Sequence, residues 1–257
     1  MIWFLGDTHG SLGHVVQQVL LAQKNGAAPD AVVFLGDLDC AQPLHLELAE
    51  IVGVTDIYWV FGNHDSDDSR SLNNLFSSDL AGKNLHGKVE RIGGFRIAGL
   101  GGVFRSKVWA PPNAPSFPSY QAWRKDLMRK RPPKGWGIYE AGEERKHTTT
   151  IFPDVVSRLA RQRADILVCH EAPECRSDGR GWQAVGDLAR KMGVRWLFHG
   201  HHHDSPDYSE HFVEMGFKTY GVGYRGITSL LTDGKIEVIR PGDYDAARDF
   251  DWEVPNE

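Results

Sequence analysis

The sequence predicts an α/β fold, and two patterns point to that class. Short apolar runs, rich in Val, Ile and aromatic residues and each followed by a polar turn, are typical of buried strands. Between them lie segments whose apolar residues recur at the helical period, as at Val15, Val16, Val19 and Leu20. Strands that alternate with helices indicate an α/β architecture. A chain of 257 residues with 41% hydrophobic and 25% charged residues can bury such a core.

The predicted elements follow one another in a regular order. The predicted strands are Ile2–Leu5, Ala31–Leu35, Ile57–Phe61, Arg96–Leu100, Ile166–Cys169 and Trp196–Phe198. The predicted helices are Val15–Lys24, Pro43–Val52, Val155–Arg163 and Val185–Met192. Towards the C-terminus the pattern changes to short strands at Lys218–Val222, Ile227–Leu231 and Lys235–Ile239. The last two are joined at Asp233-Gly234, a residue pair typical of a tight hairpin.

Composition and charge exclude several classes of protein. No apolar run reaches the roughly 18 residues of a membrane span, and the first residues lack the basic region of a secretory signal. Three cysteines, Cys40, Cys169 and Cys175, cannot form a disulfide framework, so we expect a reducing, cytoplasmic environment. The net charge of −5 argues against nucleic-acid binding over the whole surface.

Residues 104–150 depart from the alternating pattern. The segment contains six prolines, and its ten basic and four acidic side chains give a net charge of +6, which leaves −11 for the rest of the chain. Long Pro-rich connections in compact domains are usually functional or mobile. We therefore expect a single domain over residues 1–257 with an insertion at 104–150, which is either a solvated loop or a cap that attracts phosphate. The candidate substrate-binding residues of a cap are Arg124, Lys125 and Arg129.

The polar residues that follow the predicted strands are the main functional signal. Five strands are followed, in order, by Asp7-Thr8-His9, Gly36-Asp37, Gly62-Asn63-His64-Asp65, His170-Glu171 and Gly200-His201-His202-His203. Ligand sites in open α/β sheets lie beyond the carboxyl ends of the strands, so these groups should converge. Carboxylate oxygens and imidazole nitrogens suit divalent zinc, manganese or iron. Paired cysteines are absent, which excludes a structural zinc site of the finger type.

These motifs, in this order, resemble the five motifs of the calcineurin-like metallophosphoesterases. The resemblance covers about residues 1–232 apart from the insertion, and it implies a four-layer αββα sandwich. It also implies two divalent metal ions, manganese, iron or zinc, with manganese expected to support activity in vitro. The implied ligands are Asp7, His9 and His203 for one ion, Asn63, His170 and His201 for the other, and Asp37 as the bridge.

The resemblance implies a reaction as well as a metal site. It is the hydrolysis of phosphate mono- or diesters by attack of a metal-bound hydroxide. His64 matches the family histidine that lies near the substrate and acts as general acid towards the leaving group, and Asp65 follows it as a second candidate catalytic residue. Two branches of the family fit poorly. Gly36-Asp37-Leu38-Asp39 is not followed by the phosphate-binding Arg of the protein Ser/Thr phosphatases, and Cys40 replaces the Tyr ligand of purple acid phosphatases.

Two other functions remain open at this point. A metal-dependent nuclease or cyclic-nucleotide phosphodiesterase would use the basic, aromatic insertion to bind nucleic acid. A non-catalytic metallophosphoesterase-like binding scaffold would have lost ligands or His64, yet all of them are present. We therefore expect an enzyme with a phosphorylated small molecule or nucleotide as substrate, nucleic acid as a possible partner and no membrane partner. The sequence gives no sign of the oligomeric state.

Overall fold

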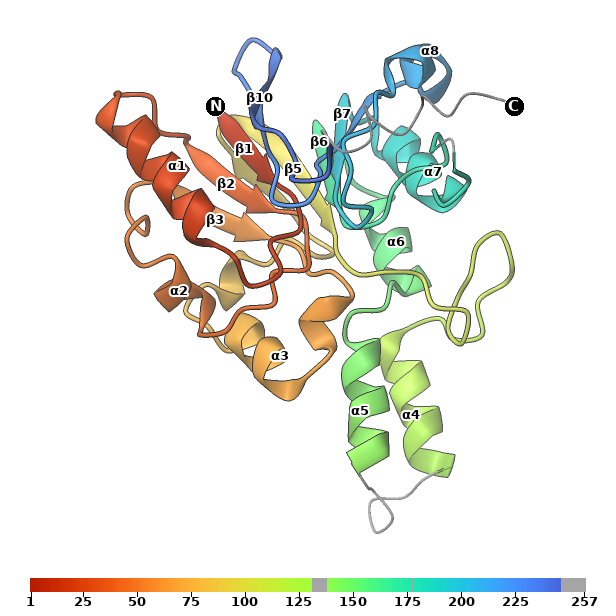
Figure 1. Ribbon diagram of the computed structural model, residues 1–257. Coiled ribbons are helices and arrows are strands. Elements are labelled where there is room, and N and C mark those ends of the chain that lie inside the picture. Colours follow the sequence, from red (N-terminus) through yellow and green to blue (C-terminus); the bar gives the residue numbers. More distant parts are fainter. Residues whose placement is uncertain (131–137, 177, 246–257) are drawn as a thin grey trace, which may run out of the picture.

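Two five-stranded sheets form the centre of the computed structural model, which describes residues 1–130, 138–176 and 178–245 (Figure 1). The strand orders are β10-β9-β1-β2-β3 and β4-β5-β6-β7-β8. The first sheet consists of β1 (Ile2–Leu5), β2 (Ala31–Phe34), β3 (Asp56–Trp59), β9 (Ile227–Leu230) and β10 (Ile236–Arg240). The second consists of β4 (Val89–Ile92), β5 (Phe95–Leu100), β6 (Ile166–Cys169), β7 (Trp196–His199) and β8 (Lys218–Gly221).

Most of the helices cover the outer faces of the two sheets, whereas the two helices of the insertion extend away from them (Figure 1). The described helices are α1 (Gly13–Lys24), α2 (Leu44–Glu47), α3 (Ser69–Phe76), α4 (Tyr120–Lys130), α5 (Ile138–His147), α6 (Pro153–Leu159), α7 (Gln183–Met192) and α8 (Phe212–Met215). Short 3₁₀ turns include η1 (His64–Ser66) and η2 (Ala81–Lys83). Apolar residues of α1 pack on the first sheet, and those of α6 and α7 pack on the second. None of the described helices has the length and apolar composition needed to cross a membrane.

The core explains why central strands such as β1, β2 and β6 are apolar throughout. Side chains alternate along a strand, so Ile2 and Phe4 of β1 face the second sheet while Trp3 and Leu5 face the helices. Between the sheets, Phe4 stacks on Phe198 of β7 with ring centroids 3.7 Å apart. Each sheet therefore buries apolar side chains on both of its faces, and the predicted four-layer αββα sandwich is confirmed.

Some element boundaries differ from the prediction. The predicted helix Pro43–Val52 is helical only over Leu44–Glu47, because the chain then continues in tight turns, such as the bond from the Ile51 N–H to the Leu48 carbonyl (2.9 Å). Helix α6 begins at Pro153, a residue well suited to the first helical position, and ends at Leu159 instead of Arg163. Strand β4 and helix α3 were not predicted.

The insertion contains two helices that the sequence analysis did not predict. Helices α4 and α5 lie side by side and extend away from the sheets (Figure 1). Trp123 of α4 is buried with Val108 and with Phe152, which precedes α6. Residues 131–137, between the two helices, lie outside the described residues. The described part of the insertion thus has a small hydrophobic core of its own.

Candidate metal centre

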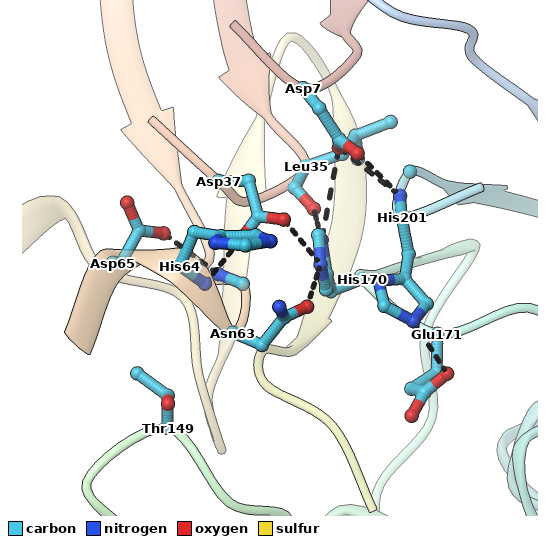
Figure 2. Close-up of polar contacts among 12 residues, drawn as sticks. Asp7, Leu35, Asp37, Asn63, His64, Asp65, Thr149, His170, Glu171 and His201 are labelled. Carbon is cyan, nitrogen blue, oxygen red and sulfur yellow. Dashed lines mark hydrogen bonds and ion pairs between the residues drawn. The ribbon is translucent and has the colours of Figure 1, made fainter. Parts of the chain in front are cut away.

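The side chains that follow five strands meet at the carboxyl ends of the two sheets (Figure 2). The strands concerned are parallel within each sheet, β1 with β2 and β3, and β6 with β7, so their carboxyl ends lie at the same edge. Among the described residues, three groups of side chains have ligand atoms within 4.8 Å of one another. Two consist of predicted ligands, Asp7, His9 and His203 in the first and Asp37, His170 and His201 in the second, and the third is Glu171, His201 and His202. Asn63 joins the second group. The structure therefore brings all seven predicted ligands together.

In the first group, three side chains point at a common centre. His203 Nε2 lies 3.2 Å from an Asp7 carboxylate oxygen and 3.2 Å from His9 Nε2. The other ring nitrogen of His9, Nδ1, lies 2.6 Å from an Asp39 carboxylate oxygen. A carboxylate that accepts a hydrogen bond from Nδ1 fixes the orientation of the ring and leaves Nε2 available as a metal ligand. Asp39 is thus a supporting residue to which the sequence analysis assigned no role.

The second group is built around His170, which is fully buried. Its Nδ1 donates a hydrogen bond to the Leu35 carbonyl at 2.8 Å, so Nε2 faces the site. Nε2 lies 3.3 Å from Asp37 Oδ2 and 3.2 Å from Asn63 Oδ1. Figure 2 shows Asp37, Asn63 and His170 directed at one another from three different loops.

Asp37 lies between the two groups. Its Oδ2 is 3.3 Å from His170 Nε2 in one group and 4.0 Å from His9 Nε2 in the other. Its Oδ1 accepts a hydrogen bond from the His64 backbone N–H at 2.8 Å, which fixes the carboxylate. One oxygen therefore faces ligands of both groups, as a bridging carboxylate must.

Charge is unevenly distributed over this buried cluster. Burial favours the neutral form of Asp37, but the neighbouring His170 ring and the His64 N–H outweigh burial and lower its pKa. Burial alone would lower the pKa of His170, but the neighbouring Asp37 carboxylate outweighs burial and raises it. Burial and the nearby His170 lower the pKa of His201 to about 3, so this ring is neutral at pH 7 and can act as a ligand.

The backbone at the site adopts an uncommon conformation. Among the described residues other than glycine, six have a positive φ, and four of them are His9 (41°), Asp37 (48°), His201 (71°) and His203 (61°). Left-handed backbone costs about 1–3 kcal/mol in a residue that bears a Cβ, and it persists where the surrounding structure enforces it. The fold therefore tolerates strain at the positions that aim these side chains.

Two glycines allow the loops to approach each other. A Cβ on Gly62 would lie 2.2 Å from Asp37 Oδ1 and 2.5 Å from His170 Cε1. A Cβ on Gly36, which has a φ of 111°, would lie 2.3 Å from His170 Nδ1. No larger side chain fits at either position without displacing a predicted ligand.

The two candidate catalytic residues have different surroundings. Asp65 is buried, and its carboxylate accepts backbone hydrogen bonds from Leu38 (2.8 Å), Asp39 (3.0 Å) and Gly62 (2.8 Å). It therefore ties the loop after β2 to the loop after β3. His64 is 45% exposed, and its Nδ1 lies 2.6 Å from an Asp67 carboxylate oxygen. Its ring centroid is 5.1 Å from that of His9, which places His64 beside the first group.

The donor set fits two divalent ions. It offers two carboxylates, one amide oxygen and four imidazoles, which is the mixture of oxygen and nitrogen ligands that zinc, manganese and iron accept. Two of these histidines, His9 and His170, have a hydrogen-bonded second nitrogen, as metal-bound imidazoles usually do. The residues present are therefore suitable ligands for two divalent ions.

The candidate substrate-binding residues on α4 make their described contacts within the insertion. Arg124 pairs with Glu144 of α5, and Arg129 pairs with Asp126 at 2.9 Å. Lys125 is exposed. Their role in substrate binding stays a prediction.

A hollow of about 420 Å³ adjoins the second group. Its lining includes the ligands Asn63 and His201 together with Glu171, Arg105 and Arg180. Glu171 is buried, and one of its carboxylate oxygens accepts from the Phe104 backbone N–H at 3.0 Å. Sequence reasoning did not single out Arg105 or Arg180 for this site; Arg105 is the first basic residue of the insertion.

Comparison with known proteins agrees with this geometry. The family of calcineurin-like phosphoesterases matches residues 1–205, and the chain belongs to that family. An uncharacterised protein of Haemophilus influenzae is 37% identical over 239 residues, which cover 93% of this chain and 98% of that protein. The crystal structure of TT1561 of Thermus thermophilus superposes with a TM-score of 0.53 at 15% identity, covering 93% of this chain and 98% of that one. The chain is thus a hydrolase that acts on phosphoester bonds, and its family implies divalent metal ions.

Proposed function

We propose that this protein is a dinuclear metal-dependent phosphoesterase that hydrolyses phosphate mono- or diesters. The observation that carries the proposal is the position of Asp37 Oδ2, which faces His170 at 3.3 Å and His9 at 4.0 Å. One ion would be held by Asp7, His9 and His203, and the other by Asn63, His170 and His201, with Asp37 shared. When bound, such ions act as Lewis acids on phosphate oxygens and lower the pKa of water to about 7.

His64 is proposed as the general acid. Its Nδ1 is hydrogen-bonded to Asp67, so its Nε2 is the nitrogen that would donate a proton to the leaving oxygen. The backbone N–H of the same residue holds Asp37, which couples the position of the acid to that of the shared carboxylate. Asp65, whose contacts are three backbone N–H groups, is proposed to position His64 and Asp37.

Removal and return of metal ions test the proposal. Protein treated with a chelator should lose activity against p-nitrophenyl phosphate and its bis ester, and added Mn²⁺, Fe²⁺ or Zn²⁺ should restore it. The same panel should include 2′,3′- and 3′,5′-cyclic nucleotides and single-stranded DNA and RNA, which would reveal a nuclease or cyclic-nucleotide phosphodiesterase. Full activity after chelation, with metal content measured as zero, would contradict the proposal.

A further inference from the structure

A second and larger cavity lies between the start of the insertion and helix α5. Its volume is about 760 Å³, within the range of small-molecule binding sites. We call it the insertion cavity; its lining residues are Phe104, Arg105, Ser106, Lys107, Gly142, Glu143, Lys146 and His147. None of these residues is among the predicted metal ligands or the predicted substrate-binding residues.

The insertion cavity is adjacent to the metal centre. Phe104 and Arg105 line both this cavity and the hollow that contains Asn63 and His201. Burial lowers the pKa of Arg105, while the carboxylates of Asp67, Glu171 and Asp37 act in the opposite direction. The Arg105 guanidinium is therefore within electrostatic range of Asp37. A molecule with one end at the metal centre could extend past Arg105 into the insertion cavity.

The position of Arg105 is fixed by hydrogen bonds. Its guanidinium donates to Thr150 Oγ1 at 3.1 Å and to Thr149 Oγ1 at 3.3 Å. Thr149 Oγ1 also lies 2.7 Å from Ser66 Oγ in η1, the turn that begins with His64. Within the described part of the chain, two of the five N–H donors of Arg105 are used in this way, which leaves the others for an anion.

The lining combines positive charge with an apolar surface. Arg105, Lys107 and Lys146 supply three cations against one carboxylate, Glu143, which pairs with Lys107 at 2.7 Å. Phe104 contributes a buried aromatic ring. Burial and the nearby Arg105 lower the pKa of His147 to about 4, so this ring is neutral at pH 7. A net charge of +2 in a cavity of this size favours an organic anion over a neutral ligand.

We propose that the insertion cavity binds the leaving-group part of the substrate, and that this part carries a second phosphate, so that the preferred substrates are small organic bisphosphates. The inference rests on the proposed function, because the phosphate that is hydrolysed must lie at the metal centre. Hydrolysis adds water across the P–O bond and releases inorganic phosphate with the monophosphorylated alcohol. Arg105 would contact the substrate between the two phosphates, and Lys146 would contact the second phosphate.

The basic side chain of Lys146 could serve only to stabilise helix α5, and the experiment must exclude that role. It lies in the last turn of α5, where basic side chains stabilise a helix through its dipole. Lys24 has the same position in the last turn of α1 and is also exposed. Helix α1 packs on the first sheet, away from the inserted helices α4 and α5 (Figure 1). Lys24→Glu is therefore a matched control for Lys146→Glu, since both reverse one charge at a helix end.

The experiment compares kcat/KM for adenosine 3′,5′-bisphosphate, adenosine 3′-monophosphate and p-nitrophenyl phosphate in the Mn²⁺-loaded protein. The wild-type protein should prefer the bisphosphate. Lys146→Glu should lower the ratio of kcat/KM for the bisphosphate to that for p-nitrophenyl phosphate by about 10-fold or more, the value of one hydrogen bond to a charged group. Lys24→Glu should leave this ratio unchanged. Equal losses on all three esters in Lys146→Glu would show a structural role and overturn the inference.

Two further measurements separate the possible outcomes. Lys125→Glu tests helix α4: if it lowers the ratio and Lys146→Glu does not, α4 binds the substrate and the insertion cavity does not. Calorimetric titration of adenosine 3′,5′-bisphosphate into the Mn²⁺-loaded protein measures binding directly if no ester is hydrolysed. If no ester is hydrolysed, the proposed function fails. Weaker binding of the bisphosphate by Lys146→Glu than by the wild-type protein would still support binding at the insertion cavity. Absence of binding to the wild-type protein would overturn it.

Discussion

The loops of the metal centre and the inserted helices both present charged side chains, but they hold them in different ways. At the metal centre the carboxylates of Asp7, Asp37 and Asp65 and the ring of His170 are buried and are held by main-chain hydrogen bonds. The Asp65 carboxylate accepts hydrogen bonds from three backbone N–H groups, and His170 donates a hydrogen bond to the Leu35 carbonyl. On α4 the charged side chains are exposed and pair with other side chains, Arg124 with Glu144 and Arg129 with Asp126.

This difference suggests a division of roles. A side chain held by buried main-chain groups keeps one geometry, which the chemistry of phosphoryl transfer requires. Exposed ion pairs contribute little to stability and exchange partners readily, which suits the selection of substrates. Substitutions in the loops should therefore alter metal content and turnover, whereas substitutions in the insertion should alter which substrates are used. The following variants test this division.

The largest effect is expected from the shared carboxylate. Asp37→Asn should lose both metal ions and all measurable activity, because one oxygen of Asp37 faces both ligand groups. His203→Ala, which removes a ligand of one group only, should retain one ion per chain. Plasma emission spectrometry of the purified variants measures this. Equal metal loss in the two variants would exclude a bridging role for Asp37.

His64→Ala should reduce turnover without loss of metal. General acid assistance is worth roughly 10²–10⁴-fold, so kcat for alkyl esters should fall by about that factor. The loss should be smaller for p-nitrophenyl esters, whose leaving group needs little protonation. The measurement is kcat across a series of leaving groups, with metal content as the control. The same loss for every leaving group would mean that His64 acts on the phosphate instead.

Gly62→Ala tests how tightly the loops pack. The new Cβ would lie 2.2 Å from Asp37 Oδ1, so the carboxylate must move. We expect a loss of about 1–3 kcal/mol in unfolding free energy and reduced metal affinity. Gly82→Ala is the control, because its Cβ would have no atom within 4 Å. Thermal unfolding with and without Mn²⁺ measures both effects, and similar behaviour of the two variants would contradict the tight packing.

Trp123→Ala should damage the insertion and spare the metal centre. Trp123 is 5% exposed and packs with Val108 and Phe152, so its removal should cost about 3–5 kcal/mol within this small core. Hydrogen exchange should increase in α4 and α5, while the metal content stays at the wild-type value. Loss of metal in this variant would show that the insertion and the metal centre form one cooperative unit.

The smallest change in stability is expected at Arg124. Its ion pair with Glu144 is exposed, so Arg124→Ala should lower Tm by no more than about 2–4 °C. If Arg124 also binds substrate, as its charge and position in the insertion predict, KM for large anionic esters should rise while Tm changes by no more than that. An unchanged KM would remove Arg124 from the substrate-binding residues.

The order of strands, helices and motifs along the sequence predicted an α/β fold and the location of the candidate metal centre, whereas the four-layer arrangement was implied by the resemblance to the metallophosphoesterases. Apolar runs such as Ile2–Leu5 and Ile166–Cys169 are typical of strands buried on both faces, and the strands of both sheets were predicted apart from β4. Residues that follow parallel strands must meet at one edge, so the motifs from Asp7 to His203 indicated the centre before any distance was known. Local order along the chain was sufficient for both conclusions.

The tertiary structure alone decided what surrounds these residues. Asp39 supports His9, and Asp65 joins two loops, because segments about 30 residues apart come into contact, which no local pattern reports. Prolines flank helices α4 and α5 and kept them from being predicted, and Trp123 is a core residue because it packs with Val108 and Phe152. The insertion cavity likewise depends on contacts between residues 104–107 and 142–147. Packing between distant segments determines such features, whereas periodicity and motif order reflect only neighbours along the chain.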